Sequence, residues 1–168
     1  MGLHHAAFRC RHSEETRAFY EDFLGLPLVE ALAMEKTKTG DGLTFMHTFY
    51  QLDDGSCIAF FELPDGEEIG RPFEFKEQSD FDVHMAFQVP SLDKLHQMLN
   101  KCRDASIECR GPSDHNFVHS IYIRDPNGYV VELTTPVKPA KKHFKEAQAI
   151  AKQKVLEFVN KHSKKSRL

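Results

Sequence analysis

The sequence has no tryptophan, few cysteines and no long apolar segment, and the last two shortages each exclude a class of protein. The four cysteines form no CxxC pair and no regular spacing, so a disulfide-stapled secreted domain is not predicted. No apolar run approaches the ~20 residues of a membrane-spanning helix. The opening MGLHHAAFRC lacks the layout of a secretory signal. We therefore expect reduced thiols, a cytoplasmic location and no membrane partner.

The chain otherwise has ordinary globular composition. Its 168 residues are 40% hydrophobic and 28% charged, enough for one compact domain or two fused halves. Fourteen phenylalanines should dominate the core. The net charge of −3 conceals a basic tail, because residues 138–167 hold ten Lys/Arg and two Glu. No recognised nucleic-acid motif accompanies the tail, so we interpret it as a solvated helix face and expect no nucleic-acid partner.

Two halves of the chain carry the same pattern. FMHTFYQLDDGSCIAFFEL at 45–63 and FVHSIYIRDPNGYVVEL at 117–133 share Phe-x-His, a tyrosine, an aspartate turn and a final Glu-Leu. The earlier strand HAAFRC, beginning at His5, aligns with HMAFQV, beginning at His84. The same landmarks recur in the same order, which indicates a duplicated structural unit.

Each half predicts the element order β-α-β-β-β. In the first half Ser13 is expected to cap a helix that ends at Gly25, and in the second half Ser91 caps another. The last 30 residues predict an amphipathic helix over 140–159 that docks on the body or on a partner subunit. Strands are expected at 4–10, 26–31, 44–52, 57–62, 84–89, 107–109, 117–123 and 129–133.

The predicted fold class is therefore α+β. Two paired βαβββ modules should form a concave mixed sheet, followed by the C-terminal amphipathic helix. Module 1 covers 3–63 and module 2 covers 83–136, joined by a Pro-, Gly- and acid-rich linker at 64–82. Together they make one domain over 1–136, and 137–168 is a basic helix and tail.

A histidine opens the first strand of each half, and a glutamate lies in the last. One side chain from each strand can point to a common face, so His5, His84 and Glu132 are candidate metal ligands. The neighbouring His4 is the alternative to His5, which alternation and the repeat favour. Two His with one carboxylate suit Fe(II) and oxygen activation. Adding Glu62 as a fourth ligand suits Zn(II), Ni(II), Co(II) or Mn(II) as a Lewis acid. Structural histidines and solvent-facing carboxylates are the simpler alternatives.

A second cluster contains His115, His119 and Tyr122. On strand 117–123 His119 should lie on the face opposite to Tyr122, whereas His115 precedes the strand. A neutral histidine beside a metal can act as general acid or base, and a tyrosine hydroxyl can hold an oxyanion. The alternative is that Tyr122 packs across strands, as its repeat counterpart Tyr50 would.

The segments HHAAFRC, SEETRAFYEDFLGLPL, HMAFQV and DPNGYVVEL resemble the vicinal oxygen chelate superfamily, over about residues 3–136. That superfamily includes glyoxalase I, extradiol ring-cleaving dioxygenases, methylmalonyl-CoA epimerase, and fosfomycin and bleomycin resistance proteins. The stretch HNFVHSIYIRDPNGYVVE further resembles the extradiol dioxygenase signature. This resemblance implies that His5, His84 and Glu132 hold Fe(II), that His115 is an acid/base group, and that Tyr122 contacts a catechol-type substrate.

Two features depart from that signature. Ser113 stands two residues before His115, where the signature prefers another residue type, and Glu62 occupies the fourth-ligand position of glyoxalase I and the epimerase. Three hypotheses follow: an Fe(II) ring-cleaving dioxygenase, a glyoxalase- or epimerase-like isomerase, and a resistance-type binding protein without catalysis. All three take a small molecule. The amphipathic tail favours a homodimer, and the final Ser-Arg-Leu predicts peroxisomal import if the protein is eukaryotic.

Overall fold

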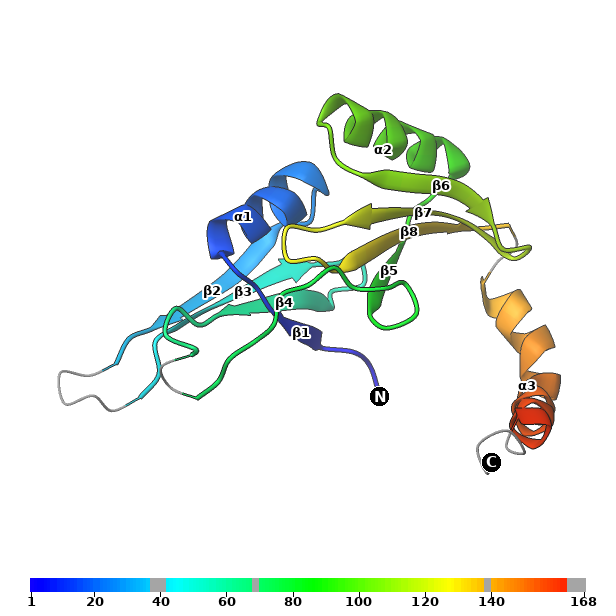
Figure 1. Ribbon diagram of the computed structural model, residues 1–168. Helices are drawn as coiled ribbons and strands as arrows, with labels where there is room; N and C mark the ends of the chain where they lie inside the picture. The colour runs from blue at the N-terminus through cyan, green and yellow to red at the C-terminus, as the bar shows by residue number, and fades with distance from the viewer. Residues whose placement is uncertain (37–41, 68–69, 138–139, 163–168) are drawn as a thin grey trace. The chain divides into compact units, whose positions relative to one another are not determined.

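The computed structural model describes residues 1–36, 42–67, 70–137 and 140–162 of the chain. These residues form an α+β fold with eight strands in two four-stranded sheets, and each half follows the order β-α-β-β-β (Figure 1). The predicted fold class is confirmed. The chain divides into two compact units, Met1–Met85 with Arg124–Val131, and Ala86–Ile123 with Glu132–Leu168.

The first sheet has the strand order β1-β4-β3-β2. Its parallel pair is β1 with β4, and its other neighbours are antiparallel. The core lies on one face, where Tyr20, Tyr50 and Phe60 are fully buried and their rings contact one another. The bounds of the strands are β1 His5–Arg9, β2 Leu28–Met34, β3 Phe45–Gln51 and β4 Cys57–Glu62.

A helical segment covers this core face, formed by α1 (Ser13–Arg17) and the wider π-helical turn η1 (Ala18–Phe23) (Figure 1). Gly25 ends it with φ +86°, the left-handed conformation that was predicted there. The prediction that Ser13 is the N-cap was wrong. His12 is the N-cap, and Ser13 is the first helical residue.

The linker after β4 forms no helix or strand in the parts that the structure describes. It is held against β1 by two cation–π contacts. The guanidinium of Arg9 lies 5.5 Å from the centre of the Phe73 ring, and that of Arg11 lies 5.0 Å from the centre of the Phe75 ring. Arg11 also donates to the carbonyl of Phe75 at 2.9 Å. The linker therefore contacts the end of β1 and the residues that follow it, although it has no regular structure.

The second sheet has the strand order β5-β8-β7-β6. Its helix is α2 (Leu92–Asp104), whose predicted N-cap Ser91 is confirmed, because the Ser91 hydroxyl accepts from the Lys94 N–H at 3.2 Å. Leu95 and Cys102 of this helix are buried, whereas Leu92 is exposed. The bounds of the strands are β5 His84–Gln88, β6 Cys109–Asp114, β7 Val118–Arg124 and β8 Val130–Pro136.

The strand predicted at 107–109 is present but lies further along the chain, since β6 begins only at Cys109. The N–H of Ile107 still donates back to the carbonyl of Cys102, which closes the end of α2. Ser106 adopts a positive φ of 56° there, so the chain turns before it can extend.

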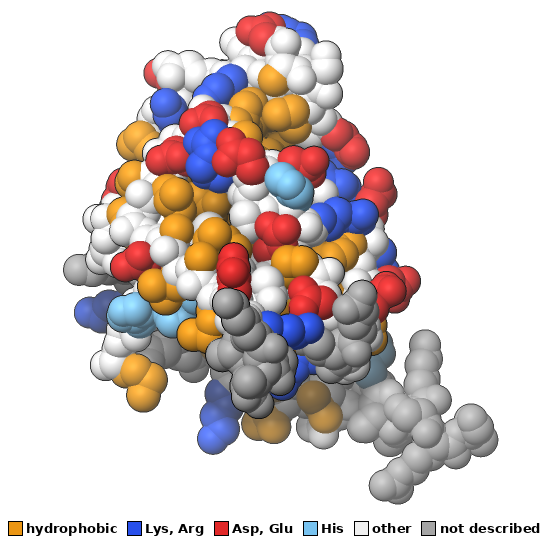
Figure 2. All heavy atoms as spheres, turned by 90° about the vertical axis from the view of Figure 1, so that its left-hand side faces the viewer, with side chains coloured by type: hydrophobic (Ala, Val, Ile, Leu, Met, Phe, Trp, Pro, Cys, Tyr) orange, Lys and Arg blue, Asp and Glu red, His pale blue; other side chains and the backbone are white. Residues whose placement is uncertain are grey.

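The last helix, α3 (Ala140–His162), confirms the predicted C-terminal helix. Phe144, Val155 and Phe158 on this helix are exposed, so these three residues are not packed in the core of the chain. None of the helices in the described ranges is long and apolar enough to cross a membrane. On the face shown in Figure 2, acidic and basic side chains are interspersed rather than separated by sign.

Candidate active site

Each half ends in a hairpin, formed by β3 and β4 in the first half and by β7 and β8 in the second. The offset between corresponding residues of the two hairpins differs from the offset that the sequence repeat suggested. The N–H of Leu52 donates to the carbonyl of Ser56 across the first turn, as the N–H of Asp125 donates to the carbonyl of Tyr129 across the second. Structurally equivalent residues in these hairpins are therefore 73 positions apart. The sequence pattern had paired the two histidines at 72 and the two glutamates at 70.

This offset changes which residues correspond. Ala59, not Glu62, occupies the position of Glu132, and Phe49, not Tyr50, occupies the position of Tyr122. A shift of one residue moves a strand side chain to the other face of the sheet. The buried packing role of Tyr50 therefore says nothing about Tyr122.

His5 lies on the face of the first sheet opposite to the helical segment. In the β1–β4 pair His5 is partnered with Cys57. The centre of its ring is 5.2 Å from that of Phe49 and 6.1 Å from that of His47, and its Nδ1 atom is 2.7 Å from Nδ1 of His4. The His5 side chain is exposed, so it is accessible to a ligand.

Glu62 lies far from His5 on the same pair of strands. It follows Cys57 by five residues, which places it about 16 Å further along the strand and on the opposite face. Its Oε2 atom accepts from the backbone N–H of Ser13 at 2.6 Å. A carboxylate at the start of a helix satisfies a free N–H and interacts favourably with the helix dipole. The structure therefore gives Glu62 a role at the start of α1 and does not bring it to His5.

His84 opens β5 with an exposed side chain. Its Nδ1 atom lies 2.7 Å from the carbonyl oxygen of Asp80. A carbonyl only accepts, so Nδ1 must carry the proton, and the lone pair of the neutral ring is then on Nε2. Metal-binding histidines commonly have this arrangement, in which a carbonyl fixes the tautomer and orients the ring.

His115 and Tyr122 are joined by a short hydrogen bond. The Nε2 atom of His115 lies 2.8 Å from the Tyr122 hydroxyl oxygen, with the two rings nearly perpendicular. The tight connection between β6 and β7 brings them together, because the N–H of His115 donates to the carbonyl of Val118. The guanidinium of Arg110 lies 5.5 Å from the centre of the Tyr122 ring. The histidine and the phenol can therefore exchange a proton.

Glu132 and Tyr122 lie on the same face of the second sheet. The Ser120 hydroxyl donates to Thr134 Oγ1 at 3.1 Å, so these two side chains share a face. Tyr122 and Glu132 are each two residues from one of them and share that face. His119 lies on the other face, where its Nδ1 atom is 4.0 Å from a carboxylate oxygen of Asp114. The structure thus brings His115 and Tyr122 together and separates His119 from them.

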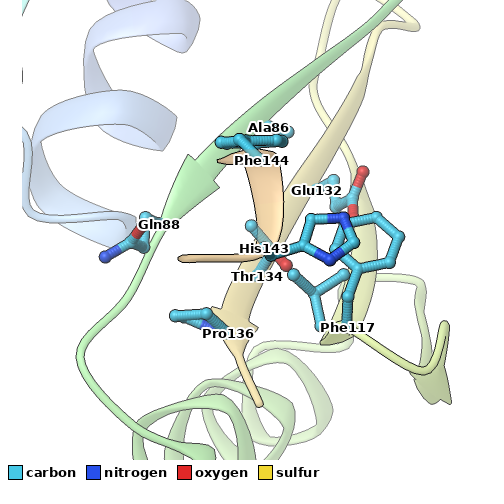
Figure 3. A pocket seen from close by; sticks show the side chains of 9 residues that line it. Ala86, Gln88, Phe117, Glu132, Thr134, Pro136, His143 and Phe144 are labelled. Carbon is cyan, nitrogen blue, oxygen red and sulfur yellow. The ribbon is translucent and has the colours of Figure 1, made fainter. Parts of the chain in front are cut away.

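A cavity of about 280 Å³ opens over this face of the second sheet (Figure 3). Its floor comes from β5 and β8, which contribute Ala86, Gln88, Glu132 and Thr134. Glu132 lines the cavity and is only 9% exposed, so it does not lie on a solvent-facing edge.

The other wall of the cavity was missed in the sequence. Phe117 lies at its rim, and α3 contributes His143 and Phe144. The sequence predicted an amphipathic helix over 140–159, which contains both residues, but periodicity shows only that a helix has an apolar side. It does not show which surface that side meets.

The predicted metal ligands come from both compact units of the chain. Within the described part of the chain, no three His, Cys, Asp or Glu side chains are grouped so that they could hold a metal ion. His5 and His84 belong to the first compact unit and Glu132 to the second. Metal binding by these residues therefore stays a prediction.

A buried polar network supports the turn between β7 and β8. Asp125 accepts from the Tyr20 hydroxyl at 3.0 Å, from the Asn127 side chain at 3.1 Å, and from the N–H groups of Asn127 and Tyr129. Burial raises the pKa of Asp125 above its ordinary value of 3.8, and these hydrogen bonds oppose that rise. The network holds the turn that precedes Glu132.

Comparison with known families identifies this architecture. The model of the Glyoxalase/Bleomycin resistance protein/Dioxygenase superfamily matches residues 2–133. The chain belongs to this superfamily. The predicted resemblance to the vicinal oxygen chelate proteins is therefore confirmed, and the superfamily includes enzymes.

A curated relative matches only a short segment of the chain. Biphenyl-2,3-diol 1,2-dioxygenase 3 of Rhodococcus globerulus is 44% identical over 51 residues, which is 30% of this chain and 27% of that enzyme. The matched segment thus spans about a quarter of the length of that dioxygenase.

Solved structures show the same fold at low sequence identity. The glyoxylase/bleomycin resistance protein/dioxygenase domain from Frankia sp. EAN1pec has a TM-score of 0.62 at 14% identity, covering 81% of this chain and 98% of that one. A variant of the fosfomycin resistance protein FosX from Listeria monocytogenes, complexed with Mn(II) and 1S,2S-dihydroxypropylphosphonic acid, has a TM-score of 0.60 at 17% identity. It covers 85% of this chain and 97% of that one.

Proposed function

We propose that this protein is an Fe(II)-dependent dioxygenase that opens the ring of a catechol-type substrate. The observation that carries the proposal is the 2.8 Å contact between His115 and the Tyr122 hydroxyl, on the sheet face that also carries Glu132. The partial match to a biphenyl-diol dioxygenase supports the same chemistry. Opening a catechol ring requires proton removal from a hydroxyl, and a histidine–phenol pair can perform it.

In this proposal His5, His84 and Glu132 hold the iron. Two imidazoles and one carboxylate suit Fe(II) and leave positions open for substrate and oxygen. The Nδ1–carbonyl hydrogen bond of His84 supports its role, because it leaves the lone pair on Nε2. When bound, Fe(II) would supply oxygen activation. His115 would take or return the substrate proton at Nε2, and Tyr122 would orient the substrate oxygen.

The isomerase alternative depends on Glu62 as a fourth ligand. Glu62 lies on the helix-covered face and accepts from Ser13, so no observation favours that ligand set. Zn(II), Ni(II), Co(II) or Mn(II) as a Lewis acid therefore has less support here than Fe(II). A binding protein without catalysis would leave the contact between His115 and Tyr122 without a role.

The direct test is oxygen uptake by protein loaded anaerobically with Fe(II), across a panel of substituted catechols, with the ring-opened product followed by absorbance. Uptake with a ring-opened product is the expected result. Tight Mn(II) or Ni(II) binding, with isomerisation and no oxygen uptake, would overturn the proposal in favour of the isomerase.

The remaining proposals concern the protein in the cell. We expect a homodimer, as the amphipathic tail predicts, which light scattering would measure as twice the 19.3 kDa chain mass. We propose a cytoplasmic location, consistent with four free cysteines. The C-terminal Ser-Arg-Leu, which prompted the peroxisomal prediction, lies outside the described residues.

A further inference from the structure

We propose that the beginning of α3 forms a wall of the substrate pocket and that this wall selects a flat aromatic ligand. The inference rests on the proposed function, because Glu132 lies at the floor of the same cavity. It concerns residues that lie beyond the superfamily match, which ends at residue 133. His143 and Phe144 would then give this chain a selectivity that the shared fold alone does not provide.

The wall is built from stacked rings. The ring of His143 lies parallel to that of Phe117, with an interplanar angle of 3° and 4.4 Å between their centres. The Phe144 ring is tilted against His143, with 5.6 Å between their centres (Figure 3). Phe117 is 39% exposed and Phe144 is 63% exposed. These rings leave apolar surface open on the cavity, where an aromatic ligand would gain most from packing.

The sheet side of the cavity includes the polar residues Gln88, Glu132 and Thr134, but most of the surface that lines the cavity is apolar. A ligand that fits this lining is mainly apolar and carries few oxygens, which would lie on the edge nearest Glu132. The cavity of about 280 Å³ lies near the lower limit of ligand pockets, about 300–1,000 Å³, so it suits a molecule of one or two rings. A substituted catechol with its apolar substituent against α3 meets these conditions.

The test measures affinity without turnover. The probe is 2-hydroxybiphenyl, which has two rings and a single hydroxyl, so it lacks the vicinal diol needed for ring opening. Titration calorimetry on the full-length protein should give a Kd that rises about tenfold in His143→Ala and in Phe144→Ala. His143→Phe should keep the affinity, because it keeps a flat ring. Phe158→Ala is the matched control, since Phe158 is a similarly exposed phenylalanine (66%) further along α3.

Several outcomes would overturn the inference. These are failure of the unaltered protein to bind the probe, unchanged affinity in both alanine variants, an equal loss in Phe158→Ala, or an equal loss in His143→Phe. Circular dichroism checks that each variant keeps its helix. If the probe binds as expected but no catechol is opened, the wall stands and the dioxygenase proposal fails. If a catechol is opened but the alanine variants bind the probe with unchanged affinity, the dioxygenase proposal stands and the wall proposal fails.

Discussion

His115 and His119 are four residues apart in the sequence, but their side chains lie in different surroundings. His115 contacts the Tyr122 hydroxyl, and His119 faces Asp114 on the other side of the sheet. We therefore expect His115→Ala to lower ring-opening turnover by about 10²–10⁴-fold, the usual contribution of a general acid or base. His119→Ala should stay within a few-fold of the unaltered protein.

The measurement is steady-state oxygen uptake at saturating catechol, with the iron content of each variant determined in parallel. Iron should stay bound in both variants, which separates proton transfer from metal binding. Equal losses of turnover in His115→Ala and His119→Ala would contradict the assignment of His115.

The two glutamates of the repeat should also behave differently. Glu132 lies at the cavity floor, whereas Glu62 accepts a hydrogen bond from the first turn of α1. Glu132→Ala should abolish iron binding, measured by elemental analysis after gel filtration. Glu62→Ala should retain iron and lower the free energy of unfolding by about 0.5–2 kcal/mol, the range for losing a helix N-terminal cap. Loss of iron in Glu62→Ala would instead support a fourth ligand.

At the scale of elements, the Tyr20–Asp125 hydrogen bond ties η1 to the turn between β7 and β8. Burial raises the pKa of Asp125 in the folded protein above its ordinary value of 3.8. The ionised carboxylate therefore lowers the free energy of unfolding at neutral pH. This destabilisation disappears as the pH falls towards 3.8 and the carboxyl group becomes protonated. Tyr20→Phe removes one donor to the ionised form. It should lower the free energy of unfolding by about 1–3 kcal/mol at pH 7.

The same loss should shrink as the pH falls from 7 to 4, because a protonated Asp125 depends less on that donor. Urea unfolding at each pH measures the difference between variant and unaltered protein. Tyr50→Phe is the control, since it removes a phenol oxygen from the same aromatic cluster but no donor to Asp125. A loss in Tyr20→Phe that grows on acidification would contradict the account.

Most helices and strands could be predicted from the sequence, because helix caps, turns and the alternation of apolar and polar residues depend on a few neighbouring residues. Gly25 and Ser91 are examples that the structure confirms. The pairing of the repeats was less successful. Phe-x-His-x-x-Tyr occurs in both halves, but the hydrogen bonds of the two turns set an offset of 73 between structurally equivalent residues. Residues that the sequence motif matches, such as Tyr50 and Tyr122, therefore lie on opposite faces of their sheets. Letter similarity alone could not reveal that shift of one residue.

The arrangement of the site could be predicted only where a residue's position in a strand determines the sheet face on which its side chain lies. Tyr122 and His119 were correctly expected on opposite faces, because alternation along β7 decides it. The partner of Tyr122 could not be deduced, since His115 lies outside the strand. The contribution of His143 was also not predictable, because a helical stripe does not specify the surface that it meets.

For the molecule as a whole, the proposed function predicts a dependence on metal. Dialysis against a chelator should abolish ring opening, and anaerobic Fe(II) should restore it. Zn(II) should not, because it has no redox chemistry to activate oxygen. Product formation before and after each addition checks this, and restoration of the full rate by Zn(II) would rule out oxygen activation by iron.

If the protein is a ring-cleaving dioxygenase, both atoms of one dioxygen molecule enter the substrate. The most direct measurement is mass spectrometry of the product formed by the Fe(II)-loaded protein from a biphenyl-2,3-diol under isotopically labelled dioxygen. We expect a ring-opened product that carries two labelled oxygen atoms from one molecule of dioxygen. An unlabelled product, or a substrate rearranged without any oxygen consumed, would contradict it.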